Sequence, residues 1–278
     1  MCRSTFVKDN ISPFHFYNVM HYPLPVNKEV FSYKEQYDCV YKGVNFSWSS
    51  KWECFDAFLV FVKKWQGLSI NLPFVKDIYL ANSIVFNAVN DSSDVDLFVV
   101  SKKNRIWISR LVMSLVFLFL WIKRTTNSSS KKFCLSFFVD EEHQDLSGLS
   151  LWKKDIYLPY WIAHLVPLYQ ESKNDDIFVY NKWILDYLPN IKLKQNIFLW
   201  IQCLCWKWKI KKIFEFLFWW KFWDVCENLV ENFWWNRIQK IIDKNPESHR
   251  WVVVKKWVLK FYLDKRKEYS DLFFSNDN

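Results

Sequence analysis

Residues 81–100 have the sequence ANSIVFNAVNDSSDVDLFVV, in which two aspartates stand directly in front of an apolar run. The run is β-branched and aromatic, which predicts a buried strand over residues 94–100. Because successive side chains of a strand point to opposite faces, we expect Asp94 and Asp96 to share one face. Two neighbouring carboxylates repel each other, and a hard divalent cation such as Mg²⁺ removes that repulsion. The pattern predicts a metal site, although aspartates at this spacing also cap ordinary loops.

A second strand is predicted over residues 75–81, and it ends in the polar corner Asn82-Ser83. A polar corner that faces a carboxylate pair suits metal-bound phosphates. We expect Asn82 to adopt left-handed backbone, which asparagine tolerates better than most residues. Residues 84–89 are predicted to form a short helix, with Ser83 as its cap and as a phosphate ligand.

This stretch resembles the signature of the DNA polymerase β-like nucleotidyltransferase superfamily, in which one strand ends in Gly-Ser and the next opens with Asp-x-Asp. Asn82-Ser83 stands where the signature has Gly-Ser, and ten residues separate it from Asp94. Similarity to a bacterial family of uncharacterised nucleotidyltransferase-domain proteins extends over residues 73–76, 133–138 and 161–169, and more loosely over residues 16–24.

The resemblance implies an α/β (α+β) fold with a small mixed sheet of nucleotidyltransferase type. It also implies Mg²⁺-dependent transfer of a nucleoside monophosphate from an NTP to an acceptor hydroxyl that the sequence does not identify. Asp94 and Asp96 would be the catalytic, metal-binding residues, and Asn82 and Ser83 would contact the nucleotide.

Active members of the superfamily usually hold their metals with a third carboxylate on the third strand, which we expect over residues 133–139. That segment contains no acid, so Asp140 at its end is the candidate third metal ligand. Lys102 and Arg105, in the loop after the Asp-x-Asp strand, are candidate triphosphate ligands, or else part of a solvated loop. The missing acid and the Asn82 substitution leave an alternative open: a non-catalytic nucleotide- or polyanion-binding protein on a degenerate scaffold.

Composition narrows the class of partner. The chain has 278 residues, 51% of them hydrophobic, and a formal net charge of +9, which favours polyanions such as nucleotides, nucleic acid or acidic lipid. Its seven cysteines are scattered and include no Cys-x-x-Cys, a pattern typical of reduced thiols in the cytoplasm. The most apolar segment, residues 111–122, is shorter than the roughly 20 residues of a membrane span. We therefore expect a buried helix there, and neither a signal peptide nor a transmembrane span.

The pattern divides the chain into three parts. Residues 1–50 are expected to form an N-terminal lobe, in a winged-helix-like arrangement; residues 51–170 form the nucleotidyltransferase domain, and residues 171–278 a helical, basic C-terminal region. Within the last part, residues 192–221 carry lysines between large apolar residues. This predicts an amphipathic helix that lies on acidic lipid or on nucleic acid; in the lipid case the chain would be a membrane-surface protein. The alternative is a bundle helix with a solvated basic face. The expected helices and strands outside the central stretch are 54–66, 106–122, 155–169, 175–187, 225–242, 252–254 and 258–263.

One feature of the composition is unusual: the chain has 18 tryptophans and 3 glycines, where average usage predicts about 19 glycines. The codon UGA means tryptophan in some genetic codes and glycine in at least one other. We therefore expect that many of the written tryptophans are glycines in the cell, among them Trp121 at the end of a helix and those of residues 219–224, as a helix break. Trp161 and Trp183 are expected to be genuine. The alternative is a protein that is truly rich in aromatic residues.

Overall fold

The computed structural model describes residues 48–85, 91–125, 130–150, 155, 157–171, 176–186, 211, 215, 220–244 and 252–261. The expected N-terminal lobe lies almost wholly outside these residues, as does most of the basic stretch 192–221. Within that stretch, Lys211 is buried and donates a hydrogen bond to the Val75 carbonyl oxygen. This lysine therefore does not face a lipid or nucleic acid surface.

The described strands form one six-stranded mixed sheet in the order β4-β1-β2-β3-β6-β5. Neighbouring strands are antiparallel except β2 and β3, which are parallel. The mixed α/β class expected from the sequence is confirmed. The strands are β1 (Val75–Ala81), β2 (Val95–Ser101), β3 (Phe133–Asp140), β4 (Val166–Tyr169), β5 (Val252–Lys255) and β6 (Val258–Phe261).

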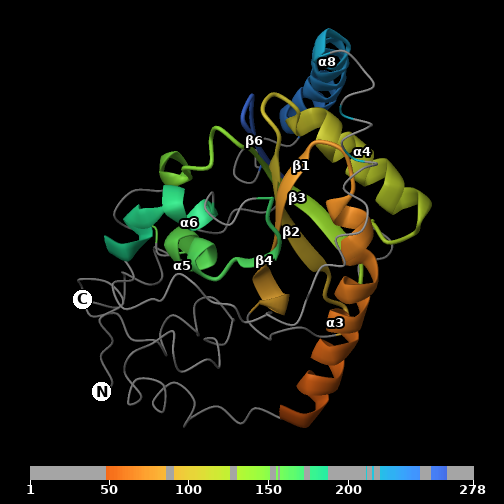
Figure 1. Cartoon of the computed structure of the whole chain (residues 1–278), viewed down its shortest axis with the longest axis vertical. Helices are drawn as coiled ribbons and strands as arrows, with labels where there is room; N and C mark the ends of the chain where they lie inside the picture. The colour runs from red at the N-terminus through yellow and green to blue at the C-terminus, as the bar shows by residue number, and fades with distance from the viewer. Residues whose placement is uncertain are drawn as a thin grey trace.

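Helices cover both faces of this sheet (Figure 1). Helices α3 (Trp48–Ile70) and α4 (Ile106–Phe119) lie on one side, and α5 (Tyr157–Ala163) and α6 (Ile177–Tyr180) lie on the other. Helix α8 (Trp220–Lys244) packs against α4. Because both faces are covered, β1 is buried along its whole length, and residues 78–81 of β1 and 97–100 of β2 are continuous apolar runs rather than alternating ones.

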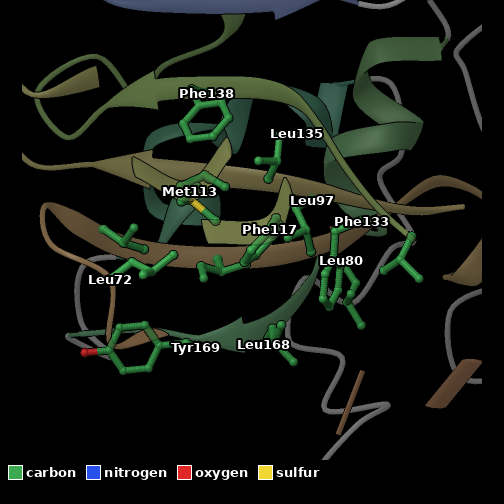
Figure 2. Packing of buried hydrophobic residues seen from close by; sticks show 14 of the residues in the cluster. Leu72, Leu80, Leu97, Met113, Phe117, Phe133, Leu135, Phe138, Leu168 and Tyr169 are labelled. Carbon is green, nitrogen blue, oxygen red and sulfur yellow. The ribbon is translucent and has the colours of Figure 1, made fainter. Parts of the chain in front are cut away.

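The core on the α3–α4 side is aliphatic and aromatic (Figure 2). Leu80 and Leu97 of the sheet meet Met113 and Phe117 of α4, with Phe133 of β3 beside them. The other face is built from aromatic rings. Phe98 lies 5.0 Å from Phe137 and 5.6 Å from Trp161, measured between ring centroids. Trp161 thus joins α5 to the two central strands.

Two expected helices are replaced by other structure. Residues 155–169, expected as one interrupted helix, form α5 and then the edge strand β4. Pro167 is tolerated in β4 because an edge strand leaves one row of backbone groups unpaired. Residues 175–187 form only the short α6, capped by Asp176, followed by a 3₁₀ helix η4 (Lys182–Asp186).

Helix α4 is buried along one face and exposed along the other. Met113 and Phe117 are fully buried, whereas Leu115, Leu118 and Phe119 are exposed. The helix expected to be buried is therefore buried on one face only. Across the part of the chain that the structure describes, no helix is both long and apolar enough to cross a membrane.

Helix α4 ends in a backbone turn that normally contains glycine. Trp121 follows the helix with φ 57° and is 82% exposed. The Ile122 amide donates to the Phe117 carbonyl at 2.9 Å, and the Trp121 amide donates to the Leu118 carbonyl at 3.0 Å. These two bonds define a Schellman motif, whose left-handed position is usually glycine. The backbone therefore supports the expectation that a glycine belongs at position 121.

The tryptophans of residues 219–224 behave differently. Helix α8 begins at Trp220 and runs through residues 221–224, so no helix break is seen within the described residues 220–224, and position 219 lies outside the described residues. Trp223 packs edge-on against Phe74, with 5.0 Å between ring centroids.

Candidate metal centre

The candidate site lies at the end of the sheet where β1 stops and β2 and β3 begin. The register places Asp96 between two partners, Ala81 of β1 and Cys134 of β3. Asp94 immediately precedes β2. One potential ligand atom from each of Asp94, Asp96 and Cys134 lies within 4.8 Å of the other two. The structure therefore brings the predicted aspartate pair together and adds a thiol to it.

Asn82 connects this group to helix α5. Its φ is 58°, so the expected left-handed backbone is confirmed. The Trp161 indole N–H donates to Asn82 Oδ1 at 2.9 Å, and the Asn82 side chain is hydrogen-bonded to Asp96. Since an ionised carboxylate only accepts hydrogen bonds, the Asn82 amide nitrogen is the donor. Trp161 thus orients the amide that holds Asp96.

Ser83 lies beside Asn82, inside the 3₁₀ turn η1 (Asn82–Ile84). It is therefore part of the turn and does not precede a helix as a cap. The helix expected over residues 84–89 falls mostly outside the described residues, which omit 86–90.

The charged form of Asp96 is electrostatically disfavoured, as expected of a cation site. Burial, and to a smaller extent the neighbouring Asp94, raise the pKa of Asp96 to about 6. Hydrogen bonds from Asn82 and Cys134 and the charge of Arg124 oppose this shift. A divalent cation between Asp94 and Asp96 would relieve the repulsion that raises this pKa.

Arg124 is a site residue that sequence reasoning missed. Its Nη1 lies 2.6 Å from Asp94 Oδ2 and 3.7 Å from Cys134 Sγ. The backbone after α4 brings it there, because the Arg124 amide donates to the Phe133 carbonyl at 2.9 Å and the Phe133 amide donates to the Ile122 carbonyl at 2.8 Å. Arg124 is 30 residues from Asp94 in sequence, and no motif signals the contact.

Cys134 was also missed, for a different reason. An acid is the usual third metal ligand, and the third strand as expected from the sequence, residues 133–139, contains none. The parallel register of β2 and β3 sets Cys134 directly beside Asp96. With this register, the second residue of β3 is the candidate third metal ligand because of its position, whatever its side chain.

Asp140 is not brought to the aspartate pair. It lies at the other end of β3, opposite Ser101. Its carboxylate accepts hydrogen bonds from the amides of Asn104 at 2.7 Å and Glu142 at 2.9 Å, as a loop cap does. The seven residues of β2 separate the two ends by about 20 Å, so Asp140 cannot share a metal with Asp94 and Asp96.

Lys102 and Arg105 follow β2 and lie at that same remote end. Lys102 is paired with Glu171, and Arg105 Nη2 lies 2.7 Å from Asp224 Oδ1. The Arg105 side chain is only 4% exposed. These residues therefore lie too far away to bind a triphosphate at the aspartate pair, and they do not form a solvated loop. They form structural ion pairs instead.

A polar pocket of about 320 Å³ opens at this remote end. Most of its charged side chains already have partners within the fold. Arg105 pairs with Asp224, and Glu227 accepts hydrogen bonds from the first amides of α4. The lining residues are Asn104, Arg105, Trp107, Asp224, Glu227, Asn228, Glu231 and Lys256.

Comparison with known proteins yields no relative: no protein-family model, no curated protein and no solved structure matches the chain. The class of protein must therefore be argued from the geometry of the site.

The donor atoms of the site suit a divalent cation. The oxygens of Asp94 and Asp96 are hard ligands that fit Mg²⁺. The Cys134 thiol is soft and fits a borderline ion such as Zn²⁺ better. The site therefore combines two ligands that Mg²⁺ prefers with one that it does not.

Proposed function

We propose that the chain is a metal-dependent nucleotidyltransferase, which transfers a nucleoside monophosphate from an NTP to an acceptor hydroxyl. One observation carries the proposal: the left-handed turn after β1 presents the Asn82 amide to Asp96, beside Asp94, at the start of β2. The order of elements also supports it. Strands β1, β2 and β3 are neighbours in the sheet, and the chain resembles the polymerase β-like superfamily in this turn and in Asp-x-Asp.

The residues have distinct roles in this proposal. Asp94 and Asp96 hold the metal, and Asn82 fixes the orientation of Asp96. When bound, a divalent cation neutralises the charge that develops on the phosphates during transfer. The Ser83 hydroxyl and the turn amides would supply hydrogen bonds to the outer phosphates. The acceptor oxygen forms a bond to the α-phosphorus, the bond from that phosphorus to the bridging oxygen breaks, pyrophosphate leaves, and the acceptor proton passes to water.

Titration calorimetry of Mg²⁺-ATP into three variants tests the site. Asp94→Asn and Asp96→Asn each remove one ligand charge and are expected to abolish metal-dependent binding while the fold survives, since asparagine is nearly isosteric. Asp145→Asn is the control, because Asp145 is exposed and caps only the Ser147 amide. Equal binding in all three variants and the wild type would sink the assignment.

A second candidate is a protein that binds nucleotide without turnover. It is favoured by Cys134, which stands beside Asp96 where an active member of the superfamily is expected to have a carboxylate. Incubation with α-labelled NTPs and a mixture of acceptors separates the two candidates. Metal-dependent binding without pyrophosphate release would favour the binding protein.

A further inference from the structure

Arg124 neutralises the aspartate pair in the structure. Its guanidinium contacts Asp94 at 2.6 Å and Cys134 at 3.7 Å, two of the three potential metal ligands. A divalent cation bound to Asp94 would repel the guanidinium on the same carboxylate, since like charges disfavour each other. Metal binding and the Arg124–Asp94 ion pair therefore compete.

The side chain of Arg124 is free to leave Asp94 without a change in the backbone. The main chain is fixed by hydrogen bonds between Arg124 and Phe133 and between Phe133 and Ile122. The Arg124 side chain is 50% exposed, whereas Asp94 is only 16% exposed. The aspartate is thus held in place, and the arginine is the partner that can move.

Two further cations lie close to the thiol. Arg110 and Lys123 both interact electrostatically with Cys134. Three cationic side chains thus act on the candidate ligands, Arg124 on Asp94 and Cys134 and the other two on Cys134, and a metal ion alone would add another positive charge beside them. A metal that enters together with a polyphosphate restores the balance of charge.

We infer that Arg124 exchanges partners: it pairs with Asp94 in the empty site and donates to nucleotide phosphate oxygens once a metal occupies the carboxylates. The inference rests on the proposed function. A guanidinium carries five N–H donors in a planar fork that matches phosphate oxygens. Arg124 thereby becomes a nucleotide-binding residue of the site, held near it by Asp94 until the substrate arrives.

The variant Arg124→Gln tests this exchange, because it should affect the binding of a bare metal ion and the binding of a metal-nucleotide complex in opposite directions. Binding of Mn²⁺ alone, measured as loss of the free Mn²⁺ signal in electron paramagnetic resonance, should tighten by about two- to fivefold, as expected when an exposed ion pair no longer competes. Binding of Mg²⁺-ATP, measured by calorimetry, should weaken by about tenfold through loss of a charge-assisted hydrogen bond. Arg124→Lys, which keeps the charge but loses the fork, should leave Mn²⁺ binding near that of the wild type and weaken Mg²⁺-ATP binding.

Lys103→Gln is the matched control. It removes one positive charge from another half-exposed ion pair, with Lys103 Nζ 2.8 Å from Glu142 Oε1, at the opposite end of the sheet. Neither probe should respond to it. A change of the same sign for both probes in Arg124→Gln, or no change in either, would overturn the inference, because a purely structural arginine gives one of these results. A wild-type protein that binds neither probe would instead refute the proposed function on which the inference rests.

Discussion

Trp121 combines a bulky side chain with a backbone conformation that disfavours it. An L-residue in the left-handed region costs about 1–2 kcal/mol relative to glycine, and the exposed indole makes little packing contact in return. Trp121→Gly should therefore raise the free energy of unfolding by about 1 kcal/mol, measured by urea denaturation. Trp235→Gly should lower it by about 1 kcal/mol, since Trp235 is partly exposed but lies within α8, where glycine disfavours helix.

Position 121 also tests the hypothesis that UGA encodes glycine in the source of this chain. Cleavage after Arg110 and Lys123 releases residues 111–123 as one tryptic peptide. If UGA encodes glycine in the source, this peptide from the native protein will have the mass that corresponds to glycine at position 121. A native peptide that retains tryptophan would reject recoding at this position, and the strain at Trp121 would then be real.

The pairing of β2 with β3 decides which residue completes the metal centre. Because Cys134 is in register with Asp96, Cys134→Asp should supply the third carboxylate that the strand lacks. Mg²⁺ binding should then tighten by about an order of magnitude, as expected for one added charge-assisted contact. Binding of Cd²⁺, which prefers thiolate, should weaken. Calorimetric titration of each metal measures both effects.

Cys226→Ser is the control for this pair of titrations. Cys226 is a free thiol on α8, so its loss should change the binding of neither Mg²⁺ nor Cd²⁺. Unchanged Cd²⁺ binding in Cys134→Asp would show that the thiol is not a ligand.

The sequence predicted the elements whose signal is local. The continuous apolar runs and the polar corner identify β1, β2 and β3, and the left-handed Asn82 follows from the residue type. The sequence predicts a helix where β4 lies, because the four residues of this strand are too few to show a strand-like alternation of apolar and polar residues. Its identity comes from pairing with β1, a contact across the fold.

The same limit explains the site residues that sequence analysis placed wrongly or missed. Lys102 directly follows β2 and Asp140 is the last residue of β3, and sequence distance alone does not show that they lie at the far end from Asp94. Strand length and direction decide this. The contact between Arg124 and Asp94 depends on the turn after α4, which orients a residue from a different part of the chain.

At the scale of the molecule, the C-terminal segments are part of the body that carries the site. Strand β6 pairs with β3, so elements from both sides of residue 171 share one sheet. Helix α8 is tied to α4 through Glu227, whose carboxylate oxygens accept from the amides of Trp107 at 2.8 Å and Ile108 at 2.9 Å. Arg105, the residue before α4, makes no side-chain cap hydrogen bond to that helix, and Glu227, 120 positions from Trp107, supplies the cap instead.

Glu227 should make the stability of the whole fold depend on pH. Burial raises its pKa from 4.5 to about 7, with a smaller contribution from Glu231; the two backbone amides and Arg105 oppose the shift. Between these two values the folded state binds more protons than the unfolded state, so the free energy of unfolding falls as pH rises. One group of this kind contributes a slope of at most about 1.4 kcal/mol per pH unit.

Asp96 acts in the same direction but at lower pH, because its pKa rises from 3.8 only to about 6. Between pH 6 and pH 7 the contribution of Glu227 is therefore larger than that of Asp96, and comparison of single variants with the wild type assigns it. Urea denaturation at several pH values should show that Glu227→Gln loses the decline in this interval, since glutamine does not ionise. Asp96→Asn should flatten the curve between about pH 4 and 6 and leave the upper interval intact. The exposed Glu142→Gln should match the wild type throughout. If Glu227→Gln and the wild type have the same slope between pH 6 and 7, the buried carboxyl that joins α8 to α4 is not protonated in the folded protein, and the cap then acts as a carboxylate over the whole range.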